Sequence, residues 1–165
     1  MPYVVGQLWW ERSFLIQNET YDYILKPEDI KKSLSDFKHK SPFNLRNSIK
    51  IMMKEYNIPE DYFYTHLVNE LSAAFKKTKA KDYIYHNGKY YKIAIIKFRM
   101  QDEKANSGKS NWWRIVALID GLNRIFYLLD LYKHSQGKDN LTAIEIKKLK
   151  ELCDEYADSL KEIGY

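Results

Sequence analysis

The sequence predicts an α+β fold: an N-terminal strand and helices, then a twisted antiparallel sheet, then a C-terminal helix. Two observations support this prediction. Between about residues 44 and 79, apolar residues recur every three or four positions, and from Tyr83 the spacing changes to two, as in strands. Near the C-terminus, Thr142 and Glu145 form the Thr-x-x-Glu pattern of a helix start.

The N-terminal half contains the predicted helices. Residues 3–16 are rich in β-branched and aromatic side chains, which favours a strand. Pro27 is followed by two acids, a pattern that opens a short helix, here to about Lys38. Between residues 44 and 79, two helical patterns flank Asn57-Ile58-Pro59, so we expect an antiparallel helix pair there.

The sheet is predicted from residue 82 onward. Asn87-Gly88 between alternating residues is a strong signal for a two-residue hairpin. Strands are expected over 89–100, 112–120 and 124–133, and their order along the chain makes an antiparallel meander. The closing helix has an apolar face formed by Ile146, Leu149, Leu152, Cys153, Tyr156, Leu160 and Ile163.

Length and composition set limits on the class of protein. A chain of 165 residues can bury its own core as one domain, which we divide into an N-terminal extension, 1–43, and a main domain, 44–165. One cysteine fits a reducing compartment, and no apolar run reaches the roughly 18 residues of a membrane span. We therefore expect a cytoplasmic protein that does not enter a membrane.

The positive charge is concentrated in one segment. The net charge is +5, but residues 89–138 hold ten Lys/Arg and four acids, so this segment is +6 and the rest sums to −1. A basic, aromatic-rich segment is typical of nucleic-acid binders, although a solvated lysine-rich face gives the same asymmetry. The four histidines are scattered without metal-ligand spacing, and no cofactor is expected.

Gly108-Lys109-Ser110 superficially resembles the end of a nucleotide-binding P-loop. Such a loop needs a glycine where this chain has Glu103, and it needs a helix directly afterwards. The following residues, WWRIVALID, predict a strand instead. The loop's positive charge must therefore serve another purpose.

Alternation along the strands predicts a basic surface on the sheet. Lys97 and Arg99 share one face of their strand, and Arg114 lies opposite the apolar row of the next strand. Tyr132 at the end of the last strand can converge with them. We expect this face to be open, with the opposite face buried. Such a surface can hold a phosphate backbone and stack bases.

These segments resemble a known family. The order KFRM, loop, GKSNWWRIVALID, RIFYLLDLY and LTAIEIKKLKEL is similar to the bacterial RelE/ParE superfamily of toxins, and most of all to its RelE and HigB branches. The resemblance covers residues 89–153 and extends weakly to the helix pair at 44–79, whereas the first 40 residues have no counterpart. Lys109, five residues before Arg114, has the spacing of that branch.

The resemblance implies a toxin of a type II toxin–antitoxin system. Such a toxin is held inactive by a cognate antitoxin, enters the ribosome and cleaves mRNA by attack of a ribose 2′-OH on the adjacent phosphate. The reaction needs a base, an acid and positive charge at the phosphorane, and the family uses no metal.

Catalytic roles follow from this chemistry, each with a simpler alternative. Arg114 would stabilise the phosphorane, or else pair with Asp120 or Asp130. Lys97 and Arg99 would position the phosphate backbone or lower the pKa of a base, or else be ordinary solvated strand residues.

The remaining candidates lie at the strand ends and in the loops. Tyr132 would stack a base or pass a proton, or belong to the core. His134 is the preferred acid, with an exposed loop histidine as the alternative. Lys109 would reach RNA phosphate or simply be mobile. Further RNA-binding candidates are Lys104, Lys133 and Trp112, because Trp112 and Trp113 face opposite ways and one of them is expected to be exposed.

Two other functions remain open at this point. A ParE-type inhibitor would bind DNA gyrase and cleave nothing. A non-catalytic RNA- or protein-binding domain could have kept the fold and lost the chemistry, and two features favour that reading: a histidine where relatives carry a basic residue, and the long N-terminal extension.

Overall fold

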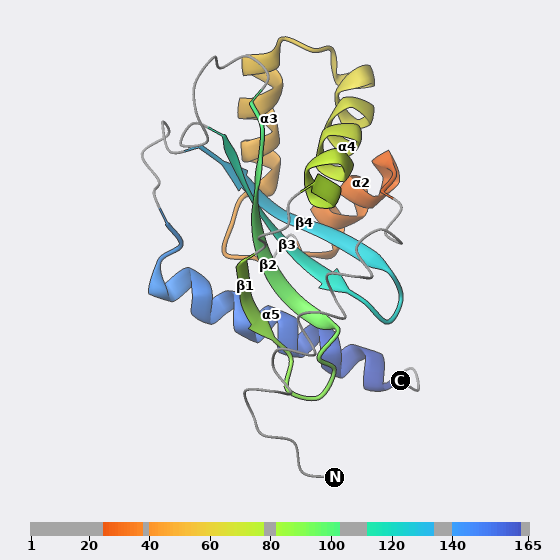
Figure 1. Ribbon diagram of the computed structural model, residues 1–165, viewed down its shortest axis with the longest axis vertical. Coiled ribbons are helices and arrows are strands. Elements are labelled where there is room, and N and C mark those ends of the chain that lie inside the picture. Colours follow the sequence, from red (N-terminus) through yellow and green to blue (C-terminus); the bar gives the residue numbers. More distant parts are fainter. Residues whose placement is uncertain (1–24, 38–39, 78–81, 103–111, 134–139, 163–165) are drawn as a thin grey trace.

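The computed structural model describes residues 25–37, 40–77, 82–102, 112–133 and 140–162. Over these residues the fold is α+β, with four helices and a four-stranded antiparallel sheet, as the sequence predicts (Figure 1). The predicted strand at 3–16 lies outside the described residues.

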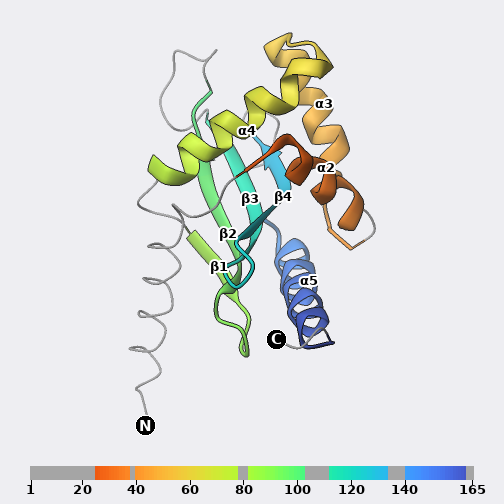
Figure 2. The same ribbon diagram turned by 90° about the vertical axis from the view of Figure 1, so that its right-hand side faces the viewer.

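Three helices precede the sheet. Helix α2 spans Pro27–Asp36, α3 spans Leu45–Tyr56 and α4 spans Glu60–Lys77. Asn57 ends α3 with a left-handed backbone, φ 51°, a conformation that asparagine tolerates, and Pro59 follows it. Helices α3 and α4 are joined at this turn as expected, but they diverge from it and do not form a closely antiparallel pair (Figure 2).

The sheet is a meander in the order β1-β2-β3-β4. Strand β1 spans Asp82–His86, β2 Ile93–Met100, β3 Trp113–Asp120 and β4 Ile125–Tyr132. Helix α5, Ala143–Glu162, closes the chain. It starts with the predicted capping box: the Glu145 N–H donates to Thr142 Oγ1 at 3.1 Å and the Thr142 N–H to Glu145 Oε1 at 2.9 Å.

The two-residue hairpin at Asn87-Gly88 was a wrong prediction. Neither residue has the positive φ that the expected turn requires, and β2 begins only at Ile93. The side-chain oxygen of Asn87 instead accepts hydrogen bonds from the backbone N–H groups of Lys89 and Tyr90, at 2.9 and 2.7 Å. The asparagine thus organises a longer turn through its side chain.

Helices cover both faces of the sheet, which makes three layers (Figure 2). Helices α2, α3 and α4 cover one face, where the predicted apolar row of β3 is fully buried. On the other face α5 packs on an apolar cluster that contains Ile93, Ile95, Val116, Leu118 and Leu129. The expectation that this second face is open was therefore wrong: α5 covers its apolar part, and Arg114 further along the same face is only 3% exposed.

Helix α2 belongs to the same core as the main domain. Its Ile30 is fully buried in the cluster beneath α3 and α4, and the Oγ of Ser33 accepts a hydrogen bond from the Leu128 N–H at 3.0 Å. The proposed boundary between residues 43 and 44 thus does not coincide with a break in packing.

Candidate functional site

The face of the sheet that α5 covers has two parts. Next to α5 the strands present the apolar cluster described above. Further along, where β2 ends and β3 begins, the same face presents Lys97, Arg99 and Arg114. The apolar part anchors a helix, and the cationic part is the candidate site.

A cross-strand row is the centre of this site. Arg99 of β2 is the register partner of Arg114 of β3, and Arg114 is in turn the partner of Tyr132 of β4. Directly paired residues have Cβ atoms roughly 5 Å apart. We call these three residues the Arg99–Arg114–Tyr132 row.

An irregularity in β4 decides which way Tyr132 faces. Strict alternation would put Tyr132 on the same face as Phe126, which packs beneath the helices. The register shifts between Val116 and Ala117, so β4 gains one residue there, and Tyr132 joins the cluster on the α5 side instead. The bulge thereby brings the phenol to Arg114.

Arg114 is a buried cation with a cationic neighbour. Its residue is only 3% exposed, and its Nη1 donates to the Trp112 backbone oxygen at 2.5 Å. Burial first, and then the positive charge of Arg99, lower the pKa of Arg114. An anion placed between the two guanidinium groups would counter both effects, because its negative charge favours the charged form of each arginine.

Tyr132 keeps its proton at neutral pH. It is 4% exposed. Burial, and after it the negative charge of Asp130, raise the pKa of Tyr132 to about 12. The phenol is therefore a neutral hydrogen-bond donor, suited to a phosphate oxygen or a leaving group, and it is not a base.

The start of α5 lies beside the row. Glu145 acts on Tyr132 electrostatically and also contributes to raising its pKa. The same carboxylate caps α5 through the Thr142 N–H. Sequence reasoning assigned Glu145 to the cap alone, because nothing local to residues 142–145 indicates the approach of β4.

The alternative explanation of Arg114 placed its charge against Asp120 or Asp130. Asp120 lies at the opposite end of β3, where it accepts hydrogen bonds from the N–H groups of Leu122 and Asn123 and from the Tyr156 hydroxyl. Asp130 accepts a hydrogen bond from the Ser48 hydroxyl at 2.6 Å. Both carboxylates thus have partners other than Arg114.

Lys133 lies on the other side of the sheet. It is 8% exposed, and its ammonium forms ion pairs with Asp102 and with Glu55, the latter at 3.0 Å, while it lies 4.9 Å from the centre of the Trp113 ring. Burial opposes the charge, but the hydrogen bonds and charges of the two carboxylates outweigh it, and the pKa of Lys133 is raised. These contacts give Lys133 a structural role.

Some of the other candidate residues lie close to the Arg99–Arg114–Tyr132 row, and the rest lie outside the described residues. Lys97 and Trp112 are half-buried, and Arg99 is exposed. Lys104, Lys109 and His134 lie outside the described residues.

Comparisons with protein-family models, with curated proteins and with solved structures find no match to this chain. Among the described residues no group of three or more His, Cys, Asp or Glu side chains could hold a metal ion. None of the described helices is both long enough and apolar enough to cross a membrane.

Proposed function

We propose that the chain is a toxin of the RelE/ParE type, an endoribonuclease that cleaves mRNA on the ribosome by 2′-OH attack on the adjacent phosphate. The Arg99–Arg114–Tyr132 row supports the proposal. Two guanidinium groups on neighbouring strands, beside a protonated phenol, suit a phosphorane, whose negative charge grows in the transition state. In this proposal the toxin is cytoplasmic and a cognate antitoxin neutralises it.

Each member of the row has a distinct role in this mechanism. Arg114, fixed by burial and by its bond to the Trp112 carbonyl, stabilises the phosphorane. Exposed Arg99 and half-buried Lys97 hold the RNA backbone on either side of the scissile phosphate. Tyr132 donates a hydrogen bond to a phosphate oxygen. As the 2′-oxygen bonds to phosphorus it releases its proton to water, and His134 supplies a proton to the 5′-oxygen as its bond to phosphorus breaks. Lys109, Lys104 and Trp112 extend the RNA contact.

The test is a reconstituted translation reaction with a defined mRNA, followed by primer extension to map cuts. Arg114→Gln should lower the single-turnover cleavage rate by about 10²–10³, the usual loss when one transition-state donor is removed. The matched control is Arg124→Gln, which removes the same charge in the turn before β4, at the opposite end of the sheet. Arg124→Gln should cleave as the wild type does.

Three results would reject the endoribonuclease. Equal losses in both variants would show that the effect comes from net charge. Intact message together with gyrase-dependent DNA breaks would identify a ParE-type inhibitor. Intact message without such breaks, with the chain still bound to RNA, would leave a non-catalytic binding domain. Thermal unfolding of both variants verifies that each is folded at the assay temperature.

A further inference from the structure

The outer side of α3 carries a row of exposed cations away from the candidate site. Arg46, Lys50 and Lys54 follow at intervals of four residues, slightly more than one helical turn, so they lie along one side of the helix. The one acid of α3, Glu55, pairs with Lys133. The charge of this α3 cation row is thus not offset within the helix.

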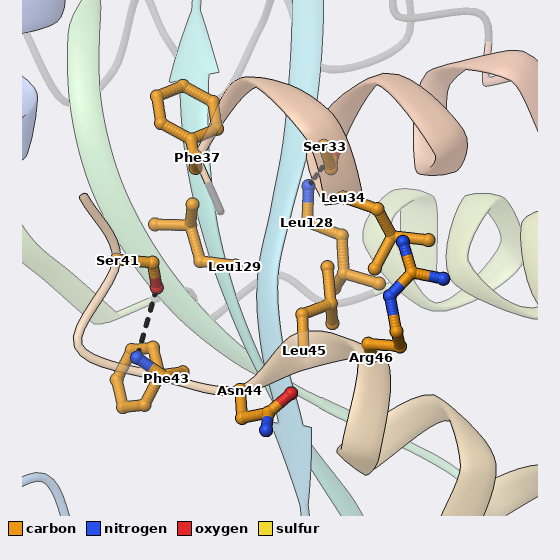
Figure 3. Close-up of a pocket in the computed structure, with 10 residues that line it drawn as sticks. All are labelled: Ser33, Leu34, Phe37, Ser41, Phe43, Asn44, Leu45, Arg46, Leu128 and Leu129. Atoms are coloured by element: carbon orange, nitrogen blue, oxygen red, sulfur yellow. Dashed lines mark hydrogen bonds between the residues drawn. The ribbon is translucent and has the colours of Figure 1, made fainter. Parts of the chain in front are cut away.

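A hollow of about 430 Å³ lies beside Arg46, at the N-terminal end of the α3 cation row, between α2, α3 and β4 (Figure 3). Its walls include Leu34, Phe37, Phe43, Leu128 and Leu129. The side chain of Arg46 lies next to Leu34 at the edge of the hollow (Figure 3). The hollow therefore offers apolar surface next to one positive charge.

The hydroxyl groups in this hollow already have partners. The Oγ of Ser33 accepts from the Leu128 N–H, and the Oγ of Ser41 accepts from the Phe43 N–H at 3.1 Å (Figure 3). Because Leu128 belongs to the edge strand and its N–H is occupied, a partner strand cannot pair there through its backbone. The apolar walls of this hollow therefore favour a ligand that binds through an apolar side chain.

A second hollow of about 340 Å³ lies further along the same helix. It is lined by Met53, Ile58 and Pro59, with the side chains of Lys50 and Lys54 also in its lining. The combination of apolar surface and cations thus occurs twice along α3. From Arg46 to Lys54 the helix rises by about 12 Å, which is close to two turns of a partner helix.

We infer that this side of α3 binds an acidic peptide segment of a partner protein, which places one large apolar side chain in each hollow and its carboxylates against the α3 cation row. A phosphate backbone would satisfy the cations but has no apolar group to fill either hollow. The inference does not require the mRNA cleavage proposed above, since the surface and the Arg99–Arg114–Tyr132 row share no residue.

The test is a fluorescence titration of the full chain with a synthetic acidic helical peptide that carries two leucines two turns apart. Arg46→Gln/Lys50→Gln/Lys54→Gln should weaken binding about tenfold or more at low salt. The matched control, Lys76→Gln/Lys89→Gln/Lys147→Gln, removes three exposed charges that are dispersed over the molecule, and it should change the affinity less than about twofold. Replacing both leucines of the peptide by alanine should weaken binding about tenfold.

Each other outcome would overturn the inference. If the peptide does not bind saturably, this side of α3 is not a docking surface. If the two triple variants weaken binding equally, the affinity comes from the net charge of the protein and not from the α3 cation row. If an RNA duplex binds, and the α3 variant loses the duplex but keeps the peptide, the surface belongs to RNA. Amide shifts at Leu34, Leu128, Met53 and Ile58 locate the bound peptide independently of activity. The result is therefore separate from the cleavage assay.

Discussion

Two buried cations on opposite sides of the sheet have contrasting environments. Lys133 is held between two carboxylates, which raise its pKa. Arg114 has a second guanidinium beside it, and its pKa is lowered. A cation whose charge is matched inside the fold contributes to stability, whereas one placed beside a like charge is suited to bind an anion from outside. Under the proposed function, Lys133 carries structural positive charge and Arg114 carries charge that binds RNA.

The largest expected effect concerns Lys133. Lys133→Ala should lower the free energy of unfolding by about 3–5 kcal/mol, because it leaves the carboxylate of Asp102, only 2% exposed, without its cation. Urea unfolding followed by circular dichroism measures the change, and Lys89→Ala, at an exposed position, is the control. A loss below about 1 kcal/mol would show that the cluster is not structural.

The same ion cluster predicts a dependence on alkaline pH. The folded pKa of Lys133 lies above the ordinary value of 10.5, so its contribution to stability is complete below that pH and is lost as the pH rises through the folded pKa. The stability difference between wild type and Lys133→Met should therefore shrink in the alkaline range. A constant difference would contradict the raised pKa.

Tyr132→Phe should slow single-turnover mRNA cleavage about tenfold, the effect of one lost hydrogen bond in the transition state. Because the pKa of Tyr132 is raised to about 12, the phenol does not titrate near neutrality, and the loss should be the same from about pH 6 to pH 8. If His134 is the acid, the wild-type rate should instead fall across this range as the imidazole loses its proton. A flat wild-type profile would remove His134 from the mechanism.

Thr142→Ala tests the start of α5 beside the row. Loss of the hydroxyl that accepts the Glu145 N–H should destabilise the protein by about 1 kcal/mol. Thr142→Ser keeps an acceptor and should restore most of the stability, as thermal unfolding can show. If alanine and serine behave alike, the cap does not contribute.

The smallest effect is expected for the stability of Arg114→Met. Removing a buried cation that lies beside Arg99 relieves repulsion and desolvation, so the free energy of unfolding should change by less than about 1 kcal/mol. The free energy of unfolding of Arg114→Met should be measured under the same conditions as that of Lys133→Met, because the two values together compare the contributions of the two buried cations to stability. Similar losses for both variants would mean that Arg114 too is structural.

Local sequence patterns determined the types and approximate ends of the elements from α2 onward. Asn57-Ile58-Pro59 ends α3, and Thr142 with Glu145 begins α5, because these signals act through hydrogen bonds within a few residues. The apolar row of β3 was predicted in the same way, since alternation on a strand is local. Asn87-Gly88 misled because an asparagine side chain can organise more than one kind of turn.

Only the tertiary structure decided how charge is used. Lys133 pairs with Glu55, which lies 78 positions earlier in the chain, and with Asp102, which lies just after β2. The sequence around Lys133 could not show that these carboxylates, and not RNA, would be its partners. The position of Tyr132 beside Arg114 depended on a register shift against β3. Pairing of charges and strand register depend on residues far apart in sequence, whereas the periodicity that predicts helices and strands is written into each segment on its own.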